Sequence, residues 1–346
     1  MGFKVKKLIY SLIKLRWRLF LPFVTFYILV TAYIALLIEP HTFKNYLTSV
    51  YWVLTTLATV GFGDYTPVTV LGKAFTILLY ITGIWLISFL IGKVIESVYV
   101  IEKLRVGGKM KYTGRNHVIL IGWGNKAKSA IQEILTSYKK TDVVIIDSLK
   151  ESPVMEDRLF YIRGDATDEE TLMRANVQKA KGVIIFAEEL IKANYAKSDP
   201  LLVDGKTLLI ATAITSIEKK LNCSVHVTVE VINQKHIRLF ERVKVDEFVP
   251  TEKMISHAAV RSLFSHGVTQ IYTELMSRQY EESIFEISKR PEWATYRDAF
   301  IDLISKGATL VANHHDFTIN QKLDEPIPED ANLFVICDVD TLSRLK

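Results

Sequence analysis

Two long apolar stretches lie in the first third of the chain. Phe20–Ile38 and Ala74–Gly92 each run for 19 positions without a charged side chain. As a helix, each stretch is about 28 Å long, close to the hydrocarbon thickness of a bilayer. Core helices of soluble proteins rarely run this far without a charge, and a cleaved signal peptide has a shorter apolar region. The pattern therefore predicts two membrane-spanning helices.

Beyond residue 115 the pattern changes to short apolar runs that alternate with helical patterns. Continuous apolar runs are typical of strands buried in a parallel sheet, and their alternation with helices predicts a Rossmann-like unit with right-handed crossovers. The six runs are Val118–Ile121, Val143–Asp147, Leu159–Gly164, Gly182–Phe186, Val225–Glu230 and Asp246–Val249. Three later runs predict a small α/β lobe: Ile284–Ile287, Thr309–Ala312 and Leu333–Asp338.

These patterns divide the chain into successive parts. We expect a basic amphipathic segment lying on membrane lipid (1–19), a two-span unit (20–100), a linker containing Gly107-Gly108 (101–114), a Rossmann-like lobe (115–250), and connecting helices with a C-terminal lobe (251–346).

Positive charge is concentrated on one side of the two spans. Before the first span lie Lys4, Lys6, Lys7, Lys14, Arg16 and Arg18; after the second come Lys93, Lys103, Arg105, Lys109, Lys111 and Arg115. The segment between the spans carries chiefly Lys44 and Lys73. Because positive loops stay in the cytosol, we expect a multi-pass protein of the plasma membrane with both termini cytosolic. Orientation accounts for the net charge of +5, and the sequence has no nucleic-acid-binding pattern.

The outward-facing segment contains the sequence Thr-Val-Gly-Phe-Gly-Asp at Thr59–Asp64, after a short helical pattern at Tyr46–Ala58. Two glycines at this spacing let the backbone adopt conformations closed to residues with a Cβ, so that successive carbonyls can face one way. The motif, set between two spans, resembles the selectivity filter of the two-transmembrane prokaryotic potassium channels.

This resemblance implies potassium ions held by backbone carbonyls, with Asp64 adding negative charge at the outer mouth. The implied filter residues are Thr59, Val60, Gly61, Phe62, Gly63 and Asp64. One filter strand cannot surround an ion, so four chains must close into a homotetramer. Most family members have Tyr at the place of Phe62, and that Tyr commonly bonds a pore-helix Trp. Trp52 is present, but Phe62 cannot form the hydrogen bond, so weaker outer support is expected.

The second span would line the inner pore. Gly83 matches the family's hinge glycine, although small residues are also common where transmembrane helices pack. Ser88 and Glu96 fall where the family's inner cavity and cytosolic vestibule lie. A ring of four Glu96 side chains would concentrate cations, and a solvated helix end explains the residue equally well.

A nucleotide fingerprint follows the first predicted strand of the Rossmann-like lobe. Gly122, Gly124 and Ala127 form the pattern G-x-G-x-x-A, and Asp147 ends the next strand, 23 residues beyond Gly124. An acid at this place bonds a ribose hydroxyl, while the glycines let phosphates approach the helix N-terminus. Trp123 is bulky for this loop and would crowd a pyrophosphate. The alternative is an inherited fold that binds nothing.

The same region resembles the RCK (also called KTN) domains that regulate potassium channels and transporters. The matching stretches are His117–Trp123, Arg163–Thr167 and Leu172–Val177, followed by Ala180. The resemblance implies that Asp147, Arg163 and Asp165 contact a nucleotide and that RCK lobes pair into a gating ring. Lys126 and Lys128 can meet phosphates or be solvated surface charges.

Calcium gating is not predicted, and no other metal site is expected. Of the three acids in the calcium site of some RCK domains, only Glu230 has a counterpart, while Ala187 and Ile232 occupy the other two places. Glu188 and Glu189 are close by, but a hard cation needs several converging oxygens.

We therefore expect a helical transmembrane pore with two spans, a pore helix and a filter loop, joined to a cytosolic Rossmann-like RCK domain and a small C-terminal α/β lobe. The expected function is a potassium channel gated by a ligand, with potassium in the filter and an adenine nucleotide or dinucleotide on the RCK domain. The alternatives are a membrane-anchored nicotinamide-dependent enzyme and a regulatory subunit of a potassium transporter. An enzyme would need a catalytic constellation, which the sequence lacks, and a regulatory subunit would not carry its own filter.

Overall fold

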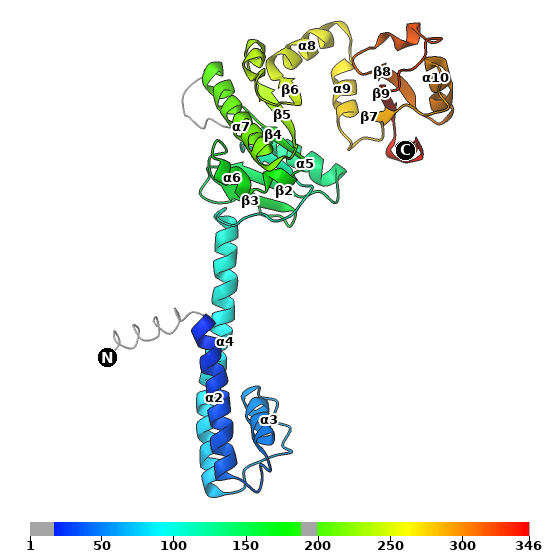
Figure 1. The fold of residues 1–346 in the computed structure, drawn as a ribbon. Helices are drawn as coiled ribbons and strands as arrows, with labels where there is room; N and C mark the ends of the chain where they lie inside the picture. The colour runs from blue at the N-terminus through cyan, green and yellow to red at the C-terminus, as the bar shows by residue number, and fades with distance from the viewer. Residues whose placement is uncertain (1–16, 188–198, 346) are drawn as a thin grey trace. The chain divides into compact units, whose positions relative to one another are not determined.

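The computed structural model describes residues 17–187 and 199–345 (Figure 1). The chain divides into two units, Met1–Lys103 and Leu104–Lys346, which are considered separately. The predicted amphipathic segment at 1–19 lies almost wholly outside the described residues, as do Glu188 and Glu189.

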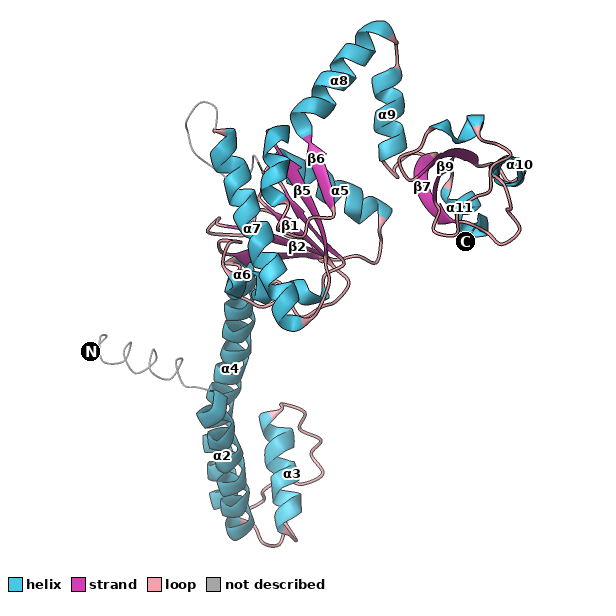
Figure 2. Cartoon of the chain, turned by 45° about the horizontal axis from the view of Figure 1, so that its top comes forward, coloured by secondary structure: helices cyan, strands magenta, loops and turns pink. Residues whose placement is uncertain are grey.

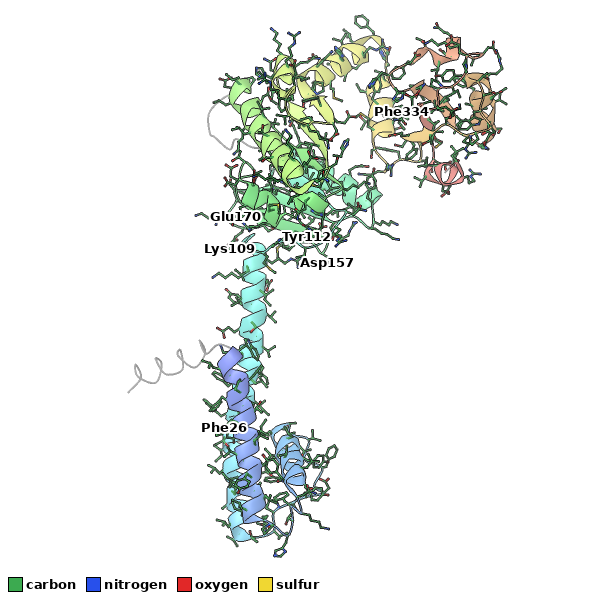
Figure 3. The ribbon with its side chains drawn as sticks, in the orientation of Figure 1. Phe26, Lys109, Tyr112, Asp157, Glu170 and Phe334 are labelled. Carbon is green, nitrogen blue, oxygen red and sulfur yellow. The ribbon has the colours of Figure 1, made fainter. Side chains whose placement is uncertain are left out.

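The first unit is helical. Its elements are α2 (Trp17–Ile38), α3 (Tyr46–Leu57) and most of α4 (Val70–Val106). Apolar side chains on α2 and α4 are largely exposed, for example Phe26 at 66% (Figure 3), as lipid-facing residues would be. A small core joins the helices through Ala32, Ala35, Phe43, Trp52, Val53, Leu57 and Leu79.

Within the described part of the chain, three helices are long and apolar enough to cross a membrane: α2, α4 and α7 (Pro200–Leu221). The helix α7 differs from the other two, because half of the residues in its most apolar 18-residue stretch are buried inside the protein. Its residues Val203, Ile210 and Ile214 belong to the core of the second unit. Length and composition alone therefore do not separate a Rossmann helix from a span.

The second unit begins with a six-stranded sheet in the order β3-β2-β1-β4-β5-β6. All neighbouring strands in it are parallel. The strands are β1 (Val118–Ile121), β2 (Val143–Asp147), β3 (Leu159–Arg163), β4 (Gly182–Ile185), β5 (His226–Val231) and β6 (Glu247–Pro250). Each lies within one residue of its predicted bounds, and the strand order is that of the Rossmann fold.

Helices cover both faces of this sheet (Figures 1 and 2). Alternate strand residues face opposite ways, so Ile119 and Ile121 pack with α7, whereas Leu120 packs with α5 (Asn125–Ser137). The short helix α6 (Glu169–Arg174) and a 3₁₀ turn at Val177–Lys179 follow β3.

The C-terminal part contains a separate, three-stranded antiparallel sheet in the order β7-β9-β8. Its elements are α8 (Thr251–Phe264), α9 (Val268–Met276), β7 (Ser283–Ser288), α10 (Tyr296–Ser305), β8 (Thr309–Asn313), β9 (Asn332–Cys337) and α11 (Val339–Leu345). Trp293, Leu303 and Leu333 are buried in its core. The predicted α/β lobe is therefore present.

Candidate functional site

The filter segment has the backbone alternation that the two glycines suggested. Thr59, Gly61 and Gly63 have positive φ angles of 57°, 58° and 78°. Residues in alternating right- and left-handed conformations turn their N–H groups to one side of the chain and their carbonyls to the other. The N–H groups of Val60 and Gly61 both donate to the carbonyl of Thr55, at 2.9 and 3.3 Å. The carbonyl of Thr55, near the end of α3, thus fixes two successive N–H groups of the segment.

Phe62 packs against the aromatic ring of Tyr51. The two rings are parallel within 1°, with centroids 6.4 Å apart. Tyr65 also contacts Tyr51, in an edge-on arrangement with the ring centroids 6.2 Å apart. Trp52, the partner expected in the family, packs instead against Phe43 at 5.0 Å and is buried. Sequence reasoning missed Tyr51, although the Tyr51-Trp52 pair on the pore helix was the available signal.

A buried carboxylate joins the two ends of the segment between the spans. Glu39 accepts hydrogen bonds from the Thr69 N–H and hydroxyl at 2.7 and 2.6 Å, and from the Thr42 hydroxyl at 3.2 Å. Its side chain also fills the space beside Gly72, where a Cβ would lie 2.2 Å from Glu39 Oε1. This Glu39 clip ties the end of α2 to the start of α4.

A cavity of about 400 Å³ between α3, the filter segment and α4 brings together several predicted pore residues. Thr59, Gly61, Gly83 and Ser88 all line it. Gly83 is buried against the pore helix, since a Cβ there would lie 2.6 Å from Leu57 Cδ2. Glu96 does not line this cavity, and its carboxylate pairs with Lys93 at 2.7 Å.

A second candidate site lies at the carboxyl ends of β1, β2 and β3. A hollow of about 90 Å³ is lined by Gly122, Asp147, Gly164, Asp165 and Lys206, among others. Lys206, on α7, was not predicted, because nothing in its local sequence points toward β3. The hollow is well below the roughly 300–1,000 Å³ of typical ligand pockets.

The fingerprint residues take the conformations that the pattern requires. Gly122 has φ +94°, Gly124 caps the N-terminus of α5, and Ala127 is fully buried where the helix meets the sheet. Of the predicted nucleotide residues, Gly122, Asp147 and Asp165 line the hollow together. Gly124, Ala127 and Arg163 do not line it.

Asp147 is buried and fastens the glycine loop. Its Oδ2 accepts the Trp123 N–H at 2.9 Å, and its Oδ1 accepts the Leu149 N–H at 3.0 Å.

Asp165 stands at the rim beside the Lys206 ammonium, 3.5 Å away. Partial burial raises the pKa of Asp165, but hydrogen bonds from the Thr167 N–H and hydroxyl, with the Lys206 charge, outweigh it and hold the pKa below its ordinary value. The carboxylate therefore stays ionised at neutral pH.

The two lysines at the start of α5 have protein partners. Lys126 lies 2.5 Å from Glu230, whose Oε1 also accepts the Thr251 hydroxyl at 2.6 Å. Lys128 lies over the Trp123 ring at 5.7 Å. Within the described ranges, no group of three metal-ligating side chains comes together.

Comparisons with known proteins agree with this architecture. The ion channel family model matches residues 22–99, and the TrkA-N domain model matches residues 118–251. The putative potassium channel protein YugO of Bacillus subtilis is 32% identical, over 71% of this chain and 73% of the relative. The calcium-gated potassium channel TvoK of Thermoplasma volcanium is 27% identical, over 70% and 67%. The solved GsuK channel has a TM-score of 0.48 at 17% identity and covers 94% of this chain and 57% of its own. The resemblance seen in the sequence is confirmed: this chain belongs to the family of two-transmembrane prokaryotic potassium channels that carry an RCK (TrkA-N) domain.

Proposed function

We propose that this potassium channel selects its ion with Thr59–Asp64 and is gated by an adenine nucleotide bound at the carboxyl ends of β1, β2 and β3. Four chains would surround one ion pathway, and their RCK lobes would pair into a gating ring. Potassium would then move passively across the plasma membrane. The concentration of Lys and Arg before α2 and after the span in α4 supports a cytosolic location for both termini.

The observation that carries the filter proposal is the alternation of positive φ angles at Thr59, Gly61 and Gly63, together with the donation of the Val60 and Gly61 N–H groups to the Thr55 carbonyl. Carbonyls freed in this way can replace the hydration shell of a potassium ion.

Ion flux into liposomes containing the purified protein tests the filter. Wild-type protein should pass potassium far better than sodium, and Gly61→Ala should abolish the selective flux. A Cβ at Gly61 meets nothing within 4 Å, so the loss would come from the φ of +58° and not from a clash. The matched control is Gly92→Ala, which also has open space but lies in the helix α4 with no positive φ. Equal sodium and potassium flux through the unmodified protein would overturn the proposal.

The gating proposal is supported by the residues that meet at the second hollow. Gly122 opens the loop, Asp147 can bond a ribose hydroxyl, and Lys206 places a cation near phosphates. At about 90 Å³ the hollow must widen to take an adenine nucleotide. A ligand that widens its own pocket has different affinities for the two shapes, and that difference is what allows binding to drive gating.

Nucleotide binding and channel response can be measured on the same full-length protein, with ADP and NAD⁺ as probes. Asp147→Ala should weaken binding and the change in potassium flux by similar free energies, of the order of 1–3 kcal/mol per site. Asp246→Asn is the matched control, because Asp246 also accepts a backbone N–H, that of Val227 at 2.8 Å, but does not line the hollow. If wild-type protein binds neither probe, the pocket is a relic of the fold and gating lies elsewhere.

A further inference from the structure

Two residues after the end of α4 lies a glycine, Gly108, that also contacts the RCK sheet. Gly108 has φ +61°, its N–H donates to the Arg105 carbonyl at 3.1 Å, and the Lys109 N–H donates to the Leu104 carbonyl at 3.0 Å. This is the Schellman arrangement, in which a left-handed glycine ends a helix. Figure 3 labels Lys109 and Tyr112 on the segment that continues from this point.

The same glycine is hydrogen-bonded to the end of β3. Its carbonyl accepts the Arg163 N–H at 3.0 Å and one amino group of the Arg174 guanidinium. The other amino group of Arg174 donates to the Arg163 carbonyl at 3.1 Å. The fit is tight, because a Cβ on Gly108 would lie 2.4 Å from the Arg163 backbone nitrogen. We call Gly108, the Arg163 backbone and the Arg174 side chain the clasp.

A second bond holds the same helix end to the loop that leaves β2. The Val106 carbonyl accepts the Ser152 N–H at 2.7 Å. Tyr161, beside Gly108, donates its hydroxyl proton toward the carbonyls of Asp147 and Leu149, at 2.9 and 2.7 Å.

The clasp and the candidate nucleotide hollow share one strand end. Arg163 is paired in register with Asp147, and the next residue, Gly164, donates its N–H to the Asp147 carbonyl at 3.0 Å. Gly164 and Asp165 line the hollow. The residues that would touch the ligand are therefore adjacent to the clasp both along the chain and across the ladder.

We propose that Gly108 and Arg174 are positioning residues for gating, which carry a change in the nucleotide hollow to the end of α4. This inference rests on the proposed nucleotide gating and adds the route by which it acts. A ligand that widens the hollow displaces Gly164 and Asp165. Since Arg163 precedes them and holds the Gly108 carbonyl, the last turn of α4 moves with the strand end. Arg174 makes this link rigid, because its planar guanidinium donates to both the Gly108 and the Arg163 carbonyls. The backbone hydrogen bond alone would let these two segments shift relative to each other.

The test compares Arg174→Gln with Arg158→Gln in full-length protein reconstituted in liposomes. Arg158 is a matched control, because its guanidinium also bridges backbone carbonyls, those of Leu135 at 2.6 Å and Tyr138 at 3.0 Å, away from the clasp. For Arg174→Gln we expect ADP or NAD⁺ affinity within about twofold of wild type, with the nucleotide-induced change in potassium flux reduced about fivefold or more. Arg158→Gln should keep the full response. Arg174→Lys, which keeps the charge but not the fork, should give an intermediate response.

A second pair of variants tests the glycine without relying on Arg174. Gly108→Ala and Gly267→Ala both put a Cβ at a positive φ, +61° and +82°, but only the first meets the Arg163 backbone, since Gly267 has nothing within 4 Å. The clasp is supported if Gly108→Ala keeps nucleotide affinity but loses the nucleotide-induced change in flux, while Gly267→Ala keeps both. A full nucleotide response in Arg174→Gln, or loss of nucleotide affinity together with the response, overturns it. Absence of nucleotide binding by the wild-type protein would overturn the proposed gating function first, so the two failures are distinguishable.

Discussion

Gly83 and Gly92 lie on the same helix, α4, but only one of them is packed. Gly83 is buried against Leu57 of the pore helix, whereas a Cβ on Gly92 would meet nothing within 4 Å. The structure shows α4 as one continuous helix through both positions. The hinge role of Gly83 stays a prediction, and the contact with Leu57 supplies a physical basis for the packing alternative.

The two roles of Gly83 predict different outcomes in a double-variant experiment. Gly83→Ala places a Cβ 2.6 Å from Leu57 Cδ2, and overpacking of this kind costs about 1–3 kcal/mol. If the role is packing, potassium flux should fall in Gly83→Ala and recover in Gly83→Ala combined with Leu57→Ala, which makes room. If the role is a hinge, shortening Leu57 should not restore flux. Gly92→Ala alone should leave flux unchanged.

His117 predicts a pH dependence of stability in the RCK domain. It is fully buried, and its Nε2 lies 2.9 Å from the Ala175 carbonyl; its Nδ1 has no hydrogen-bond partner among the residues described. Burial lowers the pKa of His117, only partly offset by the Ala175 carbonyl and the Asp142 charge. As the pH falls, His117 is therefore protonated in the unfolded chain before it is protonated in the folded one. The contribution of His117 to the free energy of unfolding is fully present above the ordinary pKa of 6.5. It is lost as the pH drops from that value toward the lower pKa of the folded protein.

Thermal unfolding of the detergent-solubilised full chain measures this effect. The wild-type melting temperature should fall between about pH 7.5 and pH 5.5, the range in which an ordinary histidine titrates. His117→Gln, which cannot be protonated there, should show a smaller fall. The Tyr112 ring, 4.4 Å from the imidazole, connects the residue to the linker, so hydrogen exchange there should rise together with the loss of stability. An equal fall in both proteins would exclude His117 as the titrating group.

At the scale of elements, the Glu39 clip connects the first span to the start of α4. Gly72→Ala should lower the melting temperature, because its Cβ would force the Glu39 carboxylate away from the Thr69 N–H. The buried group is the Glu39 carboxylate, and leaving a buried acceptor without its hydrogen-bond partner costs about 1–3 kcal/mol. Gly205→Ala, in α7 with nothing within 4 Å, should leave the melting temperature unchanged or raise it, because Ala is the better helix former. Equal melting temperatures in the two variants would show that the clip contributes nothing.

The elements were predictable from the sequence because each carries its own local signal. The short apolar run Val118–Ile121 is typical of a strand buried in a parallel sheet, and the glycines of Thr59–Asp64 indicate backbone angles that other residues avoid. The contacts that hold the sites were not predictable. Glu39 meets Thr69 across 30 residues, and Arg174 meets Gly108 across 66. Such pairs leave no periodicity, and a single sequence gives no sign of which distant carbonyl a side chain will reach.

At the scale of the whole molecule, the filter requires several copies of the chain. We expect the detergent-purified protein to have four times the chain mass of 39.5 kDa, because filter carbonyls must surround the ion from all sides. Native mass spectrometry measures this directly. A stable monomer or dimer would contradict closure around one pore.

The ion pair between Lys93 and Glu96 has a consequence for how current depends on concentration. At 2.7 Å the ammonium balances the carboxylate, so we expect four copies of the pair to add no net fixed charge to the proposed cytosolic entrance. A charged entrance enriches counter-ions at low salt, so conductance depends less steeply on potassium concentration there. A neutral entrance has no such effect. Single-channel conductance should therefore rise in proportion to cytosolic potassium at low concentrations. Replacing Lys93 by Met, which frees the acid, should raise conductance most in dilute solution and hardly at all in concentrated salt.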